Sequence, residues 1–195
     1  MVKGLIVSIF EDNDGTGIAN AIRGPEAAYG AIGTGDTATP HAESVITGRV
    51  VAQLTTEALT ISKADFSRIL VNSNDLLRVT LSHAAEVVRS HELTLNCSRH
   101  HRIDQRLAHF LRLLEFYNGN SDLPITHAGV GEILGVRRES VSTALAEYER
   151  KGNVEVNRGQ ISIRDSRALE HSSCDCQSEL AMLKVKQKKL SVLSI

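Results

Sequence analysis

The stretch that most restricts the fold covers residues 126–152, with the sequence THAGVGEILGVRRESVSTALAEYERKG. Its apolar spacing predicts one helix that reaches about Leu134 and a second helix that starts near Arg138. Only a tight turn fits between them, and Gly135 supplies a backbone conformation that other residues adopt at a cost. Gly131, on the first helix, permits a close approach of the second. The stretch therefore predicts a helix-turn-helix.

The segments on either side complete a larger unit. An apolar stripe predicts a helix over about residues 103–117, which the NGNSDLP segment ends. Residues 154–163, VEVNRGQISI, alternate apolar and polar residues around a Gly-containing turn, which predicts a β-hairpin. Helix, turn, helix and hairpin is the order of a winged helix-turn-helix. Five apolar residues are expected in the core that its helices share: Val130, Ile133, Val136, Val141 and Leu145.

This geometry leaves the start of the second helix facing outward, where two arginines precede a glutamate. An α-helix fits the DNA major groove, where Arg can donate two hydrogen bonds to guanine and Glu can accept one from cytosine. Hydroxyl groups near helix N-termini are placed to bind phosphate oxygens, and an arginine in the hairpin turn is placed to reach the backbone or minor groove. An isolated Arg-Arg-Glu would more simply form surface ion pairs. The candidate DNA-binding residues are Thr126, Arg137, Arg138, Glu139, Ser140, Ser142, Thr143 and Arg158.

A second helical pattern precedes this unit, over residues 75–97, without Gly or Pro. Two interpretations fit the pattern: an amphipathic helix that covers its own domain, or a parallel, coiled-coil-like dimer seam. The stripe consists of Leu77, Leu81, Ala84, Val88, His91 and Leu95, spaced alternately by three and four residues.

Residues 1–71 are predicted to form an antiparallel β unit with irregular loops. The apolar run Gly4–Phe10 is followed by turn-forming residues, and Ser44–Leu54 and Glu57–Ser62 are rich in β-branched residues. A Gly- and Thr-rich segment lies between the first two runs. A short helix is expected over Lys63–Leu70.

The charge of the chain is unevenly distributed. The net charge is −1, which argues against a protein coated in positive charge but not against a local basic face. Residues 1–100 carry 8 Lys and Arg against 11 Asp and Glu, and residues 101–195 carry 14 against 12. An anionic partner is therefore expected to bind the second half.

Three cysteines are too few for a disulfide framework, and no apolar run reaches transmembrane length, so we expect a cytoplasmic protein. Cys174 and Cys176 form a Cys-x-Cys beside His171, which could bind a metal or sense oxidation. A four-ligand site needs further ligands, and Cys97 is far away in sequence. Small residues at a domain end are the simpler interpretation, and no metal site is assigned.

Three further histidines, His100, His101 and His109, are expected on a helix surface near the DNA backbone rather than at a metal. No nucleophile, base and orienting group form a recognisable catalytic motif, and no phosphate-binding loop is present in the sequence. No catalytic residue is assigned, and the protein is not expected to be an enzyme.

On these motifs the chain resembles the Crp/Fnr family of bacterial transcription regulators. THAGVGEILGVRRESVSTAL follows the family's helix-turn-helix pattern without a gap, and IDQRLAHFLRLL resembles the first helix of its DNA-binding domain. RVVAQLTTEALTIS followed by KADF resembles the last strands of a cyclic-nucleotide-binding-like β-roll and the short helix after it. NCSRHHRIDQRLA and LEHSSCDC resemble a subgroup that carries Cys at both places.

The resemblance implies a homodimer whose long helices pair and whose recognition helices lie about one DNA turn apart on a near-palindromic site. It also implies RNA polymerase as a partner. The fold expected is α+β: a partial antiparallel, jelly-roll-like β-roll, a long dimerisation helix and a C-terminal winged helix-turn-helix. The predicted organisation is a sensor domain at 1–72, the dimerisation helix at 73–98, the DNA-binding domain at 99–171 and a tail at 172–195.

Three departures from the family pattern shape the prediction. Family members usually have several more strands before the equivalent of Gly4, so the sensor domain is expected to be partial. Cyclic-AMP binders pair a Gly-Glu segment with an Arg-Ser or Arg-Thr clamp, whereas here Glu26 is accompanied only by Arg49 followed by Val50. Cyclic AMP is therefore not expected to bind, and the effector is unknown. Thr143 replaces a base-reading Arg, so the target half-site should differ.

The sequence thus predicts a DNA-binding transcription regulator with a sensor-like N-terminal domain. The alternative is a ligand- or redox-sensing protein-interaction module whose winged domain is a scaffold. Arg137, Arg138 and the hairpin residue Arg158 distinguish the two, because a scaffold does not need them on one exposed face.

Overall fold

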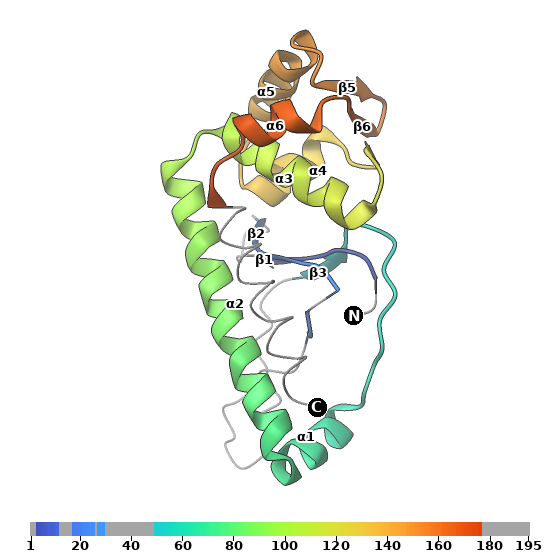
Figure 1. The fold of residues 1–195 in the computed structure, drawn as a ribbon, viewed down its shortest axis with the longest axis vertical. Coiled ribbons are helices and arrows are strands. Elements are labelled where there is room, and N and C mark those ends of the chain that lie inside the picture. Colours follow the sequence, from blue (N-terminus) through green and yellow to red (C-terminus); the bar gives the residue numbers. More distant parts are fainter. Residues whose placement is uncertain (1–2, 12–16, 26, 30–48, 177–195) are drawn as a thin grey trace. The chain divides into compact units, whose positions relative to one another are not determined.

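The chain divides into two compact units, Met1–Glu92 and Leu93–Ile195. Among the helices that are described, none combines the length and the hydropathy needed to cross a membrane. The computed structural model describes residues 3–11, 17–25, 27–29 and 49–176 (Figure 1).

The first unit contains a three-stranded antiparallel sheet in the order β2-β1-β3. Its strands are β1 (Ile6–Glu11), β2 (Gly17–Arg23) and β3 (Arg49–Ala52). Val7 and Ile9, on one face of the central strand, are 0% and 2% exposed. The apolar run that predicted a strand over Gly4–Phe10 therefore forms the centre of the sheet, because its alternate side chains are buried.

One prediction for this unit is wrong, and one of its strands was not predicted. Glu57–Ser62 is not a strand: Glu57 makes an isolated bridge to Lys3, and Leu59 is 86% exposed, so the segment has no buried face. Strand β2 was not predicted, because its Gly, Ala and Asn residues have low strand propensity and only pairing with β1 extends them. Residues 44–48, Glu26 and most of the Gly- and Thr-rich segment lie outside the described residues.

Two helices follow, α1 (Lys63–Asn72) and α2 (Asn74–His100). Ser62 caps α1, where its hydroxyl accepts a hydrogen bond from the Asp65 amide at 3.0 Å. The predicted short helix and the long helix are both confirmed. Along α2, the stripe residues Leu81, Val88 and Leu95 are 61%, 58% and 60% exposed. The interpretation in which α2 covers its own domain is therefore wrong for these side chains.

The second unit contains α3 (Ile103–Asn118), α4 (His127–Leu134), α5 (Arg138–Arg150) and α6 (Ser166–Ser172). Helix α3 contacts all three of the others (Figure 1). Its apolar stripe packs inward, since Leu107, Phe110 and Leu114 are at most 1% exposed. The other large side chains of this unit that are fully buried are Leu111, Leu123, Val130, Val141, Leu145, Ile161 and Leu169.

A small antiparallel sheet in the order β4-β6-β5 completes this unit. The predicted hairpin is formed by β5 (Val154–Asn157) and β6 (Gln160–Ile163). Strand β4 (Asp122–Leu123) was not predicted, because two residues show no periodicity. It is held in place by pairing with β6 and by the Ser162 hydroxyl, which donates a hydrogen bond to the Asp122 carboxylate at 2.6 Å. Within the predicted tail, residues 177–195 lie outside the described part of the chain.

Candidate DNA-binding interface

Both ends of α4 are fixed by hydrogen bonds. At the start, the Thr126 side chain accepts a hydrogen bond from the Gly129 amide at 3.1 Å. At the end, Gly135 has a left-handed backbone with φ 63° and ψ 41°, which a residue with a side chain adopts at a cost. Arg106, on α3, donates a hydrogen bond to the Leu134 carbonyl, so the last turn is also tied to the neighbouring helix.

The turn passes very close to α4 at Gly131. A Cβ atom on Gly131 would lie 2.9 Å from the Val136 carbonyl oxygen, and the Val136 amide donates to the Gly131 carbonyl at 2.9 Å. The predicted close approach is thus confirmed, with the turn itself as the approaching segment. Of the five predicted core residues all but one are buried; Val136 is half-buried because it forms the turn.

Helix α5 buries one face and exposes the opposite one. Val141, Leu145 and Tyr148 are buried, and the Tyr148 hydroxyl donates to the Asp104 carbonyl of α3 at 2.9 Å. Near the start of the helix, Ser142 Oγ lies 2.9 Å from His127 Nδ1 of α4. These contacts fix the rotation of α5 about its own axis, which directs its remaining face to solvent.

The exposed face begins with two arginines and a glutamate. Arg137, Arg138 and Glu139 are all exposed, and within the described part of the chain none of the three forms a salt bridge. The other end of the helix differs, because Arg150 pairs with Glu147 at 2.7 Å. Hydrogen bonds from Arg150 and then Lys151 lower the pKa of Glu147 to about 2. The surface ion pairs of the simpler interpretation therefore occur at the C-terminal end of α5 and not at its start.

The predicted residues on α4 and α5 lie in two environments. Thr126, Ser140 and Thr143 are exposed, like the two arginines and the glutamate. Ser142 is half-buried, and its hydroxyl also donates to the Arg138 carbonyl at 3.1 Å. Its position favours a role in holding α4 and α5 together over contact with a ligand.

The last predicted residue, Arg158, lies exposed in the two-residue turn of the hairpin. Gly159, beside it, has φ 78°, and Asn157 pairs with Gln160 across the turn. The hairpin is attached to α5, because the Val156 amide donates to the Glu149 carboxylate at 3.0 Å. One body therefore presents both the start of α5 and Arg158.

Several contacts of the second unit join residues that lie far apart in the sequence and that only the fold brings together. His127 and Arg106 contact partners 15 and 28 positions away, a distance at which no local pattern is visible. The Cys97 and Cys174 sulfurs also lie only 3.5 Å apart. The separation of these two cysteines in sequence therefore does not argue against a shared site. His101, expected on a helix surface near DNA, is half-buried instead, and its Nδ1 lies 3.5 Å from Cys176 Sγ.

The other histidines differ from this pattern. His171, which lies beside the Cys-x-Cys in sequence, is not part of the group formed by Cys97, His101, Cys174 and Cys176. Its Nδ1 lies 2.7 Å from the Arg167 carbonyl oxygen. His100 is exposed, as expected. His109 is half-buried, and its Nδ1 is buried without a hydrogen-bond partner, so the expected surface position is wrong for this residue.

Comparisons with known proteins agree with this geometry. Residues 105–172 match the family model of the Crp-like helix-turn-helix domain. A crystal structure of a transcriptional regulator of the Crp/Fnr family from Eubacterium rectale is similar, with 21% identity and a TM-score of 0.71; the match covers 88% of this chain and 77% of that one. No curated protein matches the chain in sequence.

Two regulators from Thermus thermophilus have the same fold. One, of the CRP family, is 18% identical with a TM-score of 0.66, and the other, of the CRP/FNR family, is 18% identical with a TM-score of 0.63. Each match covers 88% of this chain and 84% of the other. All three similar proteins are described as transcriptional regulators. The chain therefore has the fold of the Crp/Fnr-family transcriptional regulators and carries a Crp-like helix-turn-helix domain.

Proposed function

We propose that this protein is a transcription regulator that binds a near-palindromic DNA operator as a homodimer, through the start of α5. The observation that carries the proposal is the exposed N-terminal end of that helix. Arg137 and Arg138 are exposed there without carboxylate partners among the described residues, while the opposite face of α5 is buried. A rigid helix with exposed basic residues at its N-terminal end is the element that enters a major groove.

The residues of this surface fall into three roles. Arg138 and Glu139 contact base edges, with Arg138 donating two hydrogen bonds to guanine and Glu139 accepting one from cytosine. Thr126, Arg137 and Ser140 contact phosphates and set the position of the helix on the duplex. Thr143 lies beyond Glu139 on the exposed face, where its hydroxyl donates to the Glu139 carbonyl at 3.0 Å, and it contributes to the choice of half-site.

The wing supplies a further contact. Arg158 contacts the DNA backbone or the minor groove beside the site, because the hairpin that carries it is attached to α5. Ser142 does not contact DNA itself. It holds α4 and α5 together through its contact with His127.

The exposed stripe on α2 supports the homodimer. Leu77 is 42% exposed and Leu81, Val88 and Leu95 are each more than half exposed in the single chain, at the spacing of a coiled-coil seam. A second copy of α2 would bury them. Under this proposal residues 73–98 pair two subunits and 99–171 bind DNA. Residues 1–72 form a sensor domain of unknown effector, and 172–195 form the tail.

The same proposal sets the context of the protein. A regulator of this kind acts in the cytoplasm, where the DNA is, and it affects transcription through RNA polymerase. Cyclic AMP is not proposed as the effector, since Arg49 is followed by Val50 and not by Ser or Thr.

The test is the binding of the purified full chain to a labelled DNA duplex, measured by fluorescence anisotropy at fixed salt concentration. The double variant Arg137→Ala, Arg138→Ala should bind at least about tenfold more weakly, because two DNA contacts are lost. Arg150→Ala is the matched control, since it removes an arginine from the same helix that is paired with Glu147. If all three proteins bind equally, the start of α5 is not the DNA-binding surface.

A further inference from the structure

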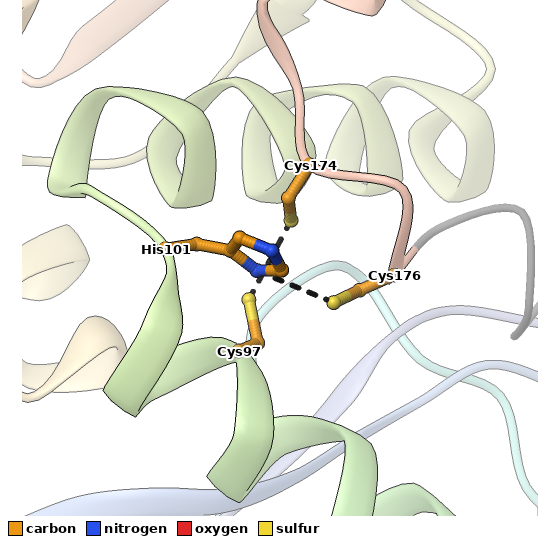
Figure 2. Close-up of side chains that lie close together, drawn as sticks. All are labelled: Cys97, His101, Cys174 and Cys176. Carbon is orange, nitrogen blue, oxygen red and sulfur yellow. Dashed lines mark hydrogen bonds between the residues drawn. The ribbon is translucent and has the colours of Figure 1, made fainter.

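Four side chains of the second unit converge at one point, although they come from two distant parts of the chain (Figure 2). Cys97 lies in the last turn of α2 and His101 follows that helix, four residues later. The His101 amide donates to the Cys97 carbonyl at 3.1 Å, so both residues lie on one face of the same helical turn. Cys174 and Cys176 follow α6, in the segment that brings the chain back to α2.

The distances match those around one tetrahedral ion. The three sulfurs and the imidazole nitrogen all lie within 4.8 Å of one another, with Cys97 Sγ and Cys174 Sγ 3.5 Å apart and Cys176 Sγ and His101 Nδ1 also 3.5 Å apart. Zinc bonds of about 2.3 Å to sulfur and about 2.0 Å to nitrogen place tetrahedral ligands about 3.8 Å and about 3.5 Å apart. The four atoms therefore need only small shifts to bind one ion.

We propose that Cys97, His101, Cys174 and Cys176 bind a single zinc ion in a closed Cys₃His site. Three soft sulfur ligands and one imidazole favour zinc over magnesium or calcium, which bind oxygen. An iron–sulfur cluster attaches its cysteines to different irons and so needs its ligands farther apart than these four. Because all four positions of the tetrahedron are filled by the protein, the site is structural and has no open position for a substrate.

The surroundings of the cluster fit a structural metal. Cys174 and Cys176 are 3% and 8% exposed, and Cys97 is half-buried. This burial limits the access of water to the sulfurs, as the outer shell of a metal site does.

The ion would join the two ends of the described part of the second unit. Its ligands lie before α3 and after α6, and α3 and α6 pack on each other. A zinc ion there would clamp the last turn of α2 and the segment after α6 to one another, which stabilises the folded unit. The proposal does not depend on DNA binding, since zinc content is measured without DNA.

The first experiment measures zinc in the full chain, purified with a reducing agent and without chelator, by elemental analysis. We expect about one zinc per chain. Cys97→Ser and Cys174→Ser should each lose most of it, because a ligand is removed. His100→Ala and His171→Ala are matched controls, each close to a ligand or to the Cys-x-Cys in sequence but outside the cluster, and both should retain zinc.

The second experiment uses only the wild-type chain and so does not depend on the folding of a variant. Cobalt(II) added to the metal-free, reduced protein should produce the sulfur-to-metal charge-transfer absorption of a thiolate site and the intense visible bands of tetrahedral cobalt, both removed by one equivalent of zinc. As a further check, His101→Cys should retain both signals. The proposal is wrong if the wild-type chain contains no zinc and gives no such spectrum, if it carries an iron–sulfur absorption, or if the serine variants keep their zinc.

Discussion

The arginines of the second unit fall into two groups that differ in their partners. Arg112 pairs with Glu115 and Glu170, at 3.5 Å and 3.6 Å, and Arg164 pairs with Glu155. Arg138, by contrast, has no carboxylate partner among the described residues. An exposed guanidinium without a partner loses no existing ion pair when it binds another acceptor, which favours its use for binding.

Arg138→Ala is predicted to weaken binding to the specific operator by about 1–3 kcal/mol, because a bidentate contact to guanine is lost. Binding to random DNA should change much less. Equilibrium titrations of both duplexes at one salt concentration measure the two losses. Arg138→Lys is the informative control, since it keeps the charge but not the two-hydrogen-bond geometry. Equal losses on both duplexes would show that Arg138 does not read bases.

Gly131→Ala is predicted to lower the free energy of unfolding by about 1–3 kcal/mol, because its Cβ would lie 2.9 Å from the Val136 carbonyl oxygen. Gly129→Ala, on the same helix, is the control. Its Cβ would meet no atom closer than the Thr126 hydroxyl at 3.4 Å, so a gain of about 0.4–1 kcal/mol is expected. Urea denaturation followed by circular dichroism compares the two, and an undestabilised Gly131→Ala would contradict the close approach.

Among the elements, the hairpin β5–β6 and helix α5 act as one body. The Glu149 carboxylate accepts a hydrogen bond from the Val156 amide. The side chains of Val154 and Ile161, one from each strand of the hairpin, are buried. The position of Arg158 in the turn is therefore fixed relative to Arg138 at the start of α5. Under the proposed function, Arg158 and α5 contact DNA together.

Arg158→Ala is predicted to weaken binding to specific and random DNA by the same factor, because a phosphate contact carries no sequence information. The slope of log affinity against log salt concentration should fall by about one. Arg164→Ala is the control, since this arginine follows the same hairpin but is paired with Glu155. A loss confined to the specific duplex would instead assign Arg158 to base recognition.

The sequence predicted the elements that depend on local signals. The two helices, their glycine turn and the hairpin each have caps, periodicity or turn residues within a short window, and the structure contains them all. Strands β2 and β4 were missed because pairing with a distant strand, and not their composition, defines them. The Cys97 cluster was missed for the same reason: its two parts are separated by 77 positions and only the packing of α6 brings them together.

At the scale of the whole molecule, the proposed function requires two chains that act together. A single α5 reads only a few base pairs, whereas a symmetric pair reads two half-sites about one DNA turn apart. Under the proposed function, the apolar stripe of α2 provides the surface for that pairing, because Leu81 and Val88 are exposed in the single chain.

The double variant Leu81→Glu, Val88→Glu is predicted to be a monomer, because four like charges would face one another across the seam. Sedimentation velocity should show the wild type as a dimer and the variant at half its mass. Leu59→Glu is the control, since Leu59 is 86% exposed outside α2. A wild-type chain that sediments as a monomer at micromolar concentration, or a double variant that remains a dimer, would contradict the proposed seam.

Selection of bound duplexes from a random DNA pool by the purified full chain is the strictest test of the proposed function. The account predicts an inverted repeat whose two half-sites are separated by about one helical turn, with a guanine in each half-site whose selection disappears in the Arg138→Ala protein. Enrichment of single half-sites, or of no sequence at all, would contradict a dimer that reads DNA through the start of α5.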